Sequence, residues 1–576
     1  MKLTARAAAL ALTAALLLPT ATALEETPAA PLTPAQKQED LDFLYDTLKA
    51  EHPGLFTHTT EADFLARKAE IEAGLEKTDD FTFAMEAQSL TALAGDSHTT
   101  VSLGSQTRDQ RFFPFSAMWF EGIWYLAAIS SSQGDFVGRI ITAINGILMD
   151  QVVERFSWLV SADNPVKLRR QAGQLLYVAD ILEYLDLAQP GEPLTLTLQD
   201  TAGSTADVSL EALSYEAFQT LSPASINDLR SGTPATAFDR SKYYFSLPLD
   251  ENTYYIQYNR CQEDPDLPMD RFAAQAAAEL EAGNYGQVIL DLRNNGGGSD
   301  GVLHPLLSAL TPSVRDGSLR LWGLVGETTY SSAVINAVMI TEMGGYLAGS
   351  PSSGSVDHFG SVASFSLPNS GLRVGCSSKW IDLSTLFETA LDYGVDPLRP
   401  DVPTAPTLED YLAGRDTEVE YLLAHGLEFQ PPDTSDRPLT RGRLLTFLYE
   451  AAGAEPTAPD APFADAVPFA YHAPAVNWAS ELGIAPGGGE GTLSPARPIT
   501  RAEAALFLTR CANLLGLSLD GEAGGFSDQA LIPAWAQDAA RRASALGMTA
   551  DVSGAFHPGG PMTQAEGKVL AAALFR

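Results

Sequence analysis

Three short runs of this sequence carry side chains suited to acyl-transfer chemistry. The first, residues 95–99, reads Gly-Asp-Ser-His-Thr and follows an apolar helical stretch. Its histidine, His98, suits a general base because imidazole changes charge near neutral pH. Ser97 beside it offers a hydroxyl group. Taken alone, a single histidine in a loop is more often an inert surface residue.

The second run, residues 291–298, reads Asp-Leu-Arg-Asn-Asn-Gly-Gly-Gly and follows the apolar stretch 288–290. Three adjacent glycines free the backbone to aim amide protons at one point, which an oxyanion hole requires. A phosphate-binding loop is the competing interpretation, but the Gly-Lys-Ser/Thr ending of such loops is missing. An ordinary flexible turn is the other alternative.

The third run, residues 328–333, reads Thr-Thr-Tyr-Ser-Ser-Ala and lies between an apolar and a helical stretch. Its first serine, Ser331, would lie at a helix N-terminus, where the dipole and free amides favour developing negative charge. Ser331 is therefore a candidate nucleophile. A serine at such a junction is more commonly only a helix cap.

The elements around these runs predict a mixed α/β chain of several domains, since 576 residues exceed what one core usually holds. Apolar spacing predicts an N-terminal helical region at 36–103, which contains His98. Short apolar or alternating runs predict a mixed α/β region at 110–235.

Residues 240–425 alternate between strand and helix and predict one α/β core. The predicted strands are Thr253–Tyr258, 288–290 and 346–348, and the predicted helices are Phe272–Leu280 and Ala333–Met343.

The C-terminal part, residues 436–576, is repetitive. Similar runs of four or five residues recur around Thr440, Thr500 and Thr563, 60 and 63 residues apart. Such a period indicates a repeat array, with two complete units and the closing half of a first unit at 436–453.

The chain begins with a short basic stretch, an apolar run and small residues, which predicts a signal peptide at 1–23 and export from the cell. No later stretch is apolar enough to predict a transmembrane helix in the mature chain. A net charge of −36 disfavours nucleic-acid binding. Three widely spaced cysteines, Cys261, Cys376 and Cys511, predict isolated buried thiols, with a single disulfide as the minority alternative.

The three runs together with Arg-Pro-Asp-Val at 399–402 resemble the tail-specific, or C-terminal-processing and tricorn-like, serine peptidase family over residues 36–425. The resemblance implies an α/β core of the ClpP/crotonase type. It also implies that Ser331 is the nucleophile, His98 the base and Ser97 an orienting hydroxyl. Gly297 and the amide of Ser332 would form the oxyanion hole, with Gly296 as the neighbouring alternative.

The sequence departs from this family in its basic and acidic residues. The stretch 349–355 lacks the lysine base of the processing-protease branch, and the nearest lysine is Lys379. The tricorn-like branch also uses a late carboxylate, for which Glu388 is favoured over Asp392. A PDZ-like module, often present in the family, is compatible with residues 138–146, although a generic strand–turn pair explains them nearly as well.

The C-terminal array resembles surface-layer homology (SLH) repeats, which implies noncovalent docking on a cell-wall polysaccharide. Arg501 is a candidate contact because it follows the repeat's threonine. The first and third units depart from the Thr-Arg-Ala-Glu form. The alternative is a helical stack that only packs on itself.

Together these features predict a bacterial serine endopeptidase that is secreted, attached to the cell wall and active on proteins or peptides without a metal or organic cofactor. One alternative is a catalytically silent wall protein that binds peptides or polysaccharide. An esterase or amidase with the same chemistry is another.

Overall fold

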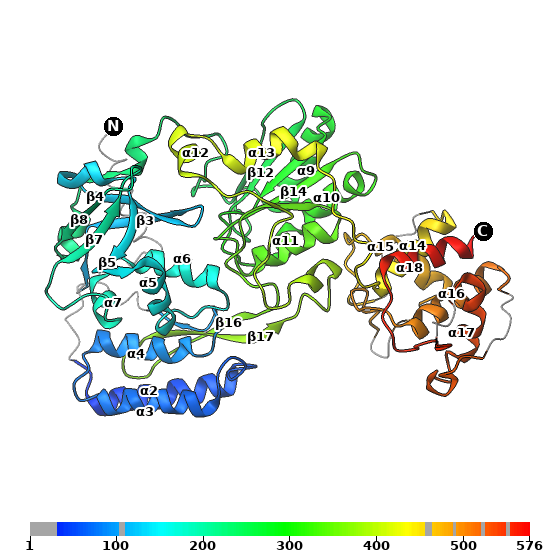
Figure 1. The fold of residues 1–576 in the computed structure, drawn as a ribbon, viewed down its shortest axis with the longest axis horizontal. Helices are drawn as coiled ribbons and strands as arrows, with labels where there is room; N and C mark the ends of the chain where they lie inside the picture. Colours follow the sequence, from blue (N-terminus) through cyan, green and yellow to red (C-terminus); the bar gives the residue numbers. More distant parts are fainter. Residues whose placement is uncertain are drawn as a thin grey trace.

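The computed structural model describes residues 31–102, 110–455, 463–485, 487, 491–519, 525–548 and 553–576. The expected signal peptide, residues 1–23, lies outside these ranges. Figure 1 shows an N-terminal part with helices and a sheet, a green α/β core and a C-terminal helical region. The chain is therefore mixed α/β, as its sequence predicts. No helix in the described ranges is long and apolar enough to cross a membrane.

Three N-terminal helices pack on a β-hairpin that comes from far along the chain. Their apolar side chains share a buried core with Leu372 and Val374 of this hairpin, and a short strand after the helices pairs with it. The helices are α2 (Pro34–Glu51), α3 (Glu61–Gly74) and α4 (Asp80–Ala92). The strands are β1 (Thr100–Val101), β17 (Arg373–Ile381) and β16 (His358–Ser366), in that order across the sheet.

Residues 110–235 form an antiparallel sheet with short helices. Its main strand order is β10-β4-β5-β7-β8, with β3 beside β4 and β6 beside β5. Asn145 and Gly146 join β5 to β6, and both have positive φ, as this two-residue hairpin turn needs. The elements are β2 (Arg111–Phe112), β3 (Phe115–Phe120), β4 (Ile123–Ser130), β5 (Ile140–Ile144), β6 (Ile147–Leu148), α5 (Met149–Arg155), α6 (Pro165–Leu175), α7 (Ala179–Tyr184), β7 (Leu194–Gln199), β8 (Thr205–Leu210), β9 (Leu213–Ser214), α8 (Tyr215–Gln219) and β10 (Pro223–Ser225).

The α/β core is a six-stranded sheet in the order β11-β12-β13-β14-β15-β18. Only β11 is antiparallel to its neighbour; helices connect β12, β13, β14 and β15 in turn, and the β16–β17 hairpin lies between β15 and β18 in the sequence. The elements are β11 (Tyr244–Pro248), β12 (Thr253–Tyr258), α9 (Met269–Gly283), β13 (Gln287–Asp291), α10 (His304–Arg315), β14 (Arg320–Val325), α11 (Ser332–Glu342), β15 (Tyr346–Gly349), β18 (Val402–Pro403), α12 (Leu408–Ala413) and α13 (Thr417–His425).

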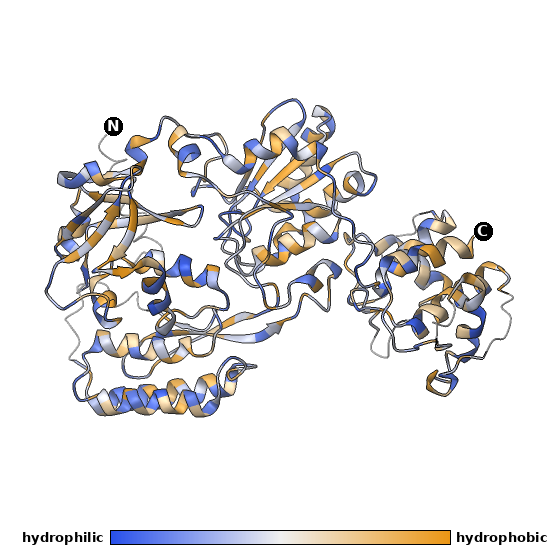
Figure 2. Cartoon of the chain, viewed as in Figure 1, coloured by the Kyte–Doolittle hydropathy of each residue, from blue (hydrophilic) through white to orange (hydrophobic). Residues whose placement is uncertain are grey.

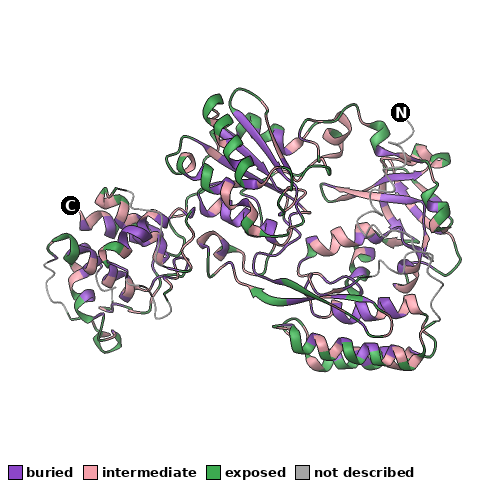
Figure 3. Cartoon of the chain, turned by 180° about the vertical axis from the view of Figure 1, so that it is seen from behind, coloured by how far each residue is buried: buried purple, intermediate pink, exposed green. Residues whose placement is uncertain are grey.

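Both faces of this sheet are covered, which explains why its strands read as continuous apolar runs. Every residue of β12 and β13 is buried, and Figures 2 and 3 show the strands of this sheet as hydrophobic and buried. Helices α9, α10 and α11 share one apolar cluster with the sheet. Val419 and Leu422 of α13 belong to a second cluster with Trp322.

The C-terminal region is helical, and its repeats close into a ring. Thr440, Thr500 and Thr563 cap the three helices α14, α16 and α18. Backbone bridges join Pro438 to Thr563, Thr440 to Pro498 and Thr500 to Pro561, so each unit touches the other two. The helices are α14 (Arg441–Ala452), α15 (Ala473–Leu482), α16 (Arg501–Leu515), α17 (Gln537–Ala543) and α18 (Gln564–Leu574).

Candidate active site

Ser331 lies in a strained turn between β14 and α11. It is the N-cap residue of α11, and its φ of 54° with ψ of −128° is a conformation that residues other than glycine rarely adopt. Thr329 Oγ1 donates a 2.9 Å hydrogen bond to the carbonyl of Leu292. The amide of Tyr330 donates to the carbonyl of Asn295 at 3.1 Å. The loop after β13 therefore holds the turn in this conformation.

The glycine loop lies directly against Ser331. A Cβ atom at Gly297 would come within 2.9 Å of Ser331 Cβ and 3.2 Å of the amide nitrogen of Ser332, so the approach requires glycine. The amides of Ser332 and Gly296 donate no hydrogen bond to any described residue. The amide of Gly297 donates to Asn295 Oδ1 at 2.9 Å. The free amide of Ser332 is therefore next to Ser331, the amide of Gly297 is already engaged, and Gly296 carries a free amide in the same loop.

His98 reaches this turn through Tyr330. The two rings are stacked, with centroids 4.6 Å apart and planes 21° apart. Ser97 Oγ and the Tyr330 hydroxyl share a 2.7 Å hydrogen bond across 233 residues of sequence. Among the described residues, no hydrogen bond joins His98 to Ser331, and such bonds are often long before substrate binds. The fold therefore brings all three sequence runs together.

The His98 side chain is 8% exposed, and neither of its ring nitrogens bonds to a described side chain. Burial, together with the nearby His358 and Lys167, lowers the pKa of His98 to about 3, and the backbone of Phe359 acts in the opposite direction. Asp96 opposes this shift, with Oδ1 lying 3.9 Å from His98 Nδ1. The imidazole is consequently neutral at pH 7, which is the state that a general base needs.

Three ionisable residues near His98 carry no signal in the sequence. His358 stacks on the ring of His98 with centroids 5.5 Å apart. Lys167 of α6 has its Nζ 3.8 Å from the Tyr330 ring centroid, and burial lowers the pKa of Lys167 to about 8. Burial also raises the pKa of Asp163. We call His98, Tyr330, His358, Lys167 and Asp163 the His98 cluster.

The structure places the predicted late carboxylates away from His98. Glu388 and Asp392 lie on a 3₁₀ turn that faces the C-terminal helical region. Glu388 pairs with Arg443 at 2.9 Å, and Asp392 pairs with Arg437 at 2.9 Å. In the described part of the chain, no contact joins either carboxylate to His98, whereas Asp96 lies beside it.

Lys379 and Arg501, two further residues predicted from the sequence, also lie outside the His98 cluster. Lys379 is exposed on β17. Arg501 is at the start of α16, where its Nε donates to the carbonyl of Phe556 at 2.7 Å. Cys261, Cys376 and Cys511 are free and buried, which confirms the prediction of isolated thiols.

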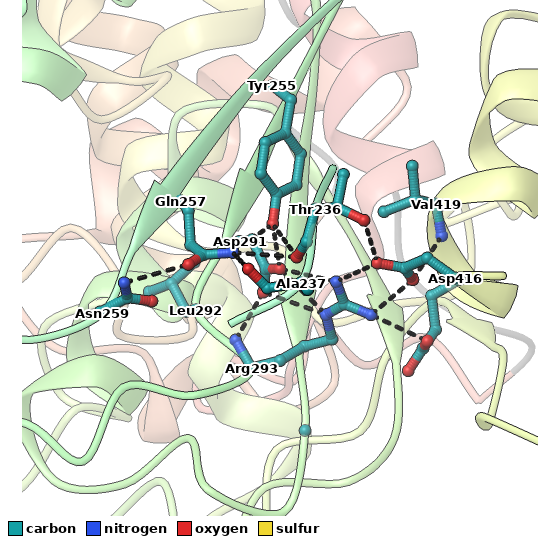
Figure 4. Close-up of polar contacts among 12 residues, drawn as sticks. Thr236, Ala237, Tyr255, Gln257, Asn259, Asp291, Leu292, Arg293, Asp416 and Val419 are labelled. Atoms are coloured by element: carbon teal, nitrogen blue, oxygen red, sulfur yellow. Dashed lines mark hydrogen bonds and ion pairs between the residues drawn. The ribbon is translucent and has the colours of Figure 1, made fainter. Parts of the chain in front are cut away.

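Asp291 and Arg293 of the second run belong to a separate buried network (Figure 4). Arg293 pairs with Asp291, Asp416 and Glu418 at 2.7, 2.8 and 2.8 Å. Tyr255 donates a 2.6 Å hydrogen bond to Asp291. We call these five residues the Arg293 cluster. It ties the start of the glycine loop to the region of α13.

Solved structures to which this chain is similar include proteases at low identity. Mature CPAF complexed with lactacystin is 12% identical, with a TM-score of 0.48 over 69% of this chain and 99% of that chain. The photosystem II D1 C-terminal processing protease is 12% identical, with a TM-score of 0.31 over 67% and 95% of the two chains. A putative S41 protease from Bacteroides fragilis is 13% identical, with a TM-score of 0.25 over 56% and 82%.

Sequence comparison also finds similarity to known proteins. An endoglucanase of Bacillus sp. (strain KSM-635) is 31% identical over 152 residues, which are 26% of this chain and 16% of that enzyme. The match therefore spans a small part of the endoglucanase. Residues 462–505 match the family model described as the S-layer homology domain. The chain thus carries an S-layer homology domain in its C-terminal helical region.

Proposed function

We propose that this chain is a secreted, cell-wall-attached serine endopeptidase with Ser331 as nucleophile and His98 as base. The strained turn at Ser331 is the observation that carries the proposal. Such backbone strain costs about 1–3 kcal/mol and is concentrated at functional sites. Ser331 makes no side-chain capping hydrogen bond to α11, so helix capping does not explain a serine in this turn.

In the proposed reaction, neutral His98 accepts the Ser331 hydroxyl proton as Oγ attacks a peptide carbonyl carbon. The amide of Ser332, with that of Gly297 or Gly296, stabilises the oxyanion. His98 then gives the proton to the leaving amine, and a water molecule hydrolyses the acyl-enzyme. Ser97 orients Tyr330, on which His98 stacks. The carboxylate that supports His98 is Asp96 in this proposal, because Glu388 lies elsewhere.

The S-layer homology domain supports attachment at the surface of a bacterium. The polysaccharide partner and the contact through Arg501 are part of the proposal. The proposal also includes export of the chain through the segment 1–23. It divides the rest of the chain into four regions, 36–103, 110–235, 240–425 and 436–576.

The main rival is a wall protein that binds peptides or polysaccharide without catalysis. A binding cleft has no need for a serine in a strained turn with a histidine stacked on the neighbouring tyrosine. An esterase or amidase would use the same residues and differ only in substrate.

The test is covalent labelling of the purified mature protein with a fluorophosphonate, read by peptide mass spectrometry. We expect an adduct on Ser331 that is absent from Ser331→Ala and forms more slowly in His98→Gln. Ser332→Ala is the matched control, because it keeps the backbone amide and should still be labelled on Ser331.

Absence of labelling in a folded protein would favour the binding protein instead. If Ser331 is labelled, hydrolysis of a peptide library and of p-nitrophenyl esters separates a peptidase from an esterase.

A further inference from the structure

The three repeat helices α14, α16 and α18 begin with the same threonine cap but with different partners. In α16, Glu503 closes a capping box with Thr500, and in α18, Glu566 does so with Thr563. In α14, the equivalent position is Arg443, which cannot accept a hydrogen bond. The first unit therefore lacks the acidic residue that the other two units supply themselves.

Glu388 of the α/β core takes this place. Its Oε2 accepts a hydrogen bond from the Thr440 hydroxyl, and its Oε1 accepts bonds of 3.1 and 2.9 Å from Nε and Nη2 of Arg443. The Tyr471 hydroxyl also donates to Oε2. The Glu388 side chain is 9% exposed, so these are the contacts of a buried, fully paired carboxylate.

The ring of repeats explains why a carboxylate is needed at the junction between the third and the first unit. From the first unit to the second, Arg441 Nη1 pairs with Glu503 at 3.3 Å. From the third unit back to the first, the corresponding positions hold Gln564 and Arg443, which offer no carboxylate. Gln564 Nε2 donates to Glu388 Oε1 at 3.1 Å. Glu388 thus bridges the two units at the junction where the repeats lack their own acid.

A second set of contacts joins the same two regions. The amide of Tyr471 donates to the carbonyl of Glu342 at the end of α11, at 2.9 Å. Arg315 of α10 donates to the carbonyl of Ala470 at 2.6 Å. Phe469 is buried in the apolar cluster of the α/β core. The segment 469–471 is therefore packed into the core.

We propose that the junction between the first and third repeat units is a docking site for the chain's own α/β core, with Glu388 as its anchoring anion. The two departures from the repeat pattern, Arg443 and Gln564, are the receptor for that anion. The core and the C-terminal region consequently move as one rigid body. This inference holds whether or not the core cleaves peptides.

The test measures the distance between spin labels on the two regions of the full chain. Ser318→Cys lies in the core and Lys568→Cys on α18; both positions are exposed, and the three native cysteines are buried. Pulsed electron–electron double resonance should give a single narrow distance peak for this labelled protein. A broad distribution here would overturn the proposal at once.

Arg443→Glu is the decisive variant, because it gives the first unit the same threonine–glutamate capping box as the other two units and repels Glu388. We expect the unit to stay folded by circular dichroism while the narrow peak is lost. Retention of the peak would overturn the role assigned to Glu388. Asp392→Asn is the matched control, because it removes a half-exposed ion pair across the same interface and should keep the peak.

Reversing both charges tests the pair directly. The double variant Glu388→Arg, Arg443→Glu should recover the narrow peak. If the double variant stays broad, the loosening does not come from this charge pair and the proposed anchor is wrong.

Discussion

The chain has two buried polar clusters that differ in how fully their groups are paired. In the Arg293 cluster, one guanidinium meets three carboxylates, and Tyr255 bonds to one of them. In the His98 cluster, neither ring nitrogen of His98 bonds to a described side chain, and Lys167 Nζ lies over the Tyr330 ring. Paired buried networks hold a backbone in place, whereas unpaired buried groups cost stability. The first cluster is therefore built to hold the loop, whereas the second contains the base of the proposed reaction.

Ser331→Ala should have the largest effect of the variants considered, and it tests the candidate nucleophile beside the His98 cluster. Loss of the nucleophile should lower hydrolysis at least about a thousandfold, without lowering the free energy of unfolding. Ser331→Gly is the matched control: it should be equally inactive, yet more stable than Ser331→Ala by about 1 kcal/mol, because glycine tolerates a φ of 54°. Urea denaturation and peptide hydrolysis measure both. Equal stability of the two variants would argue that the turn is unstrained.

Arg293→Met should destabilise the fold by disrupting the Arg293 cluster. It leaves Asp291, Asp416 and Glu418 without their cation, and breaking such a buried pair typically costs about 3–5 kcal/mol. Urea denaturation measures the loss. Arg399→Met, which removes an exposed pair with Asp396, should cost less than about 1 kcal/mol. Similar losses for the two variants would show that the buried network does not hold the core.

His98 should make the reaction insensitive to acid over a wide range. With its pKa lowered to about 3, His98 stays neutral from pH 7 to pH 5, so the labelling rate should stay nearly flat. An ordinary histidine would lose about 25-fold of its neutral form over that interval. Fluorophosphonate labelling at a series of pH values measures this. A decline near pH 6.5 would mean that the imidazole is exposed to water.

The same shift predicts a stability change with a definite sign. Below about pH 6.5 the unfolded state protonates His98, while the folded state resists protonation down to about pH 3. Stability due to His98 is therefore lost as the pH falls through this window. His98→Gln should flatten that part of the pH dependence in urea denaturation, and an unchanged slope would contradict it.

Glu418→Gln should give the smallest effect. Burial raises the pKa of Glu418 to about 7, against the opposing effect of Arg293, so the folded state holds a proton that the unfolded state releases above about pH 4.5. Stability should fall as the pH rises from about 4.5 to about 7, and Glu418→Gln should weaken this decline. Glu420→Gln, on the exposed face of the same helix, should leave it unchanged.

Local patterns in the sequence predict most of the core elements. The strand predicted at Thr253–Tyr258 is β12, and the helix predicted at Ala333–Met343 is α11, Ser332–Glu342. These elements follow from the apolar runs of a sheet covered on both faces and from local helix signals. The strained φ of Ser331 has no such signal, because distant loops impose it.

The surroundings of the candidate site depend on contacts between distant residues. Lys167 and His358 reach His98 from α6 and from the β16–β17 hairpin, and no spacing in the sequence links them. The family resemblance implies a catalytic role for Glu388, yet its carboxylate lies against Thr440 and Arg443. The direction of the Glu388 side chain is fixed by packing against the C-terminal region. The sequence around Glu388 carries no local signal of that packing.

The pairing of β1 with β17 sets the order in which the site is completed during synthesis. The segment with His98 leaves the ribosome first, but the strand beside it, Arg373–Ile381, is made more than 270 residues later. Closing a sheet over such a separation is slow and occurs only once both strands exist. A nascent chain that ends before Arg373 holds both Ser331 and His98 but cannot form this sheet. This sheet can therefore form only after most of the molecule has been made.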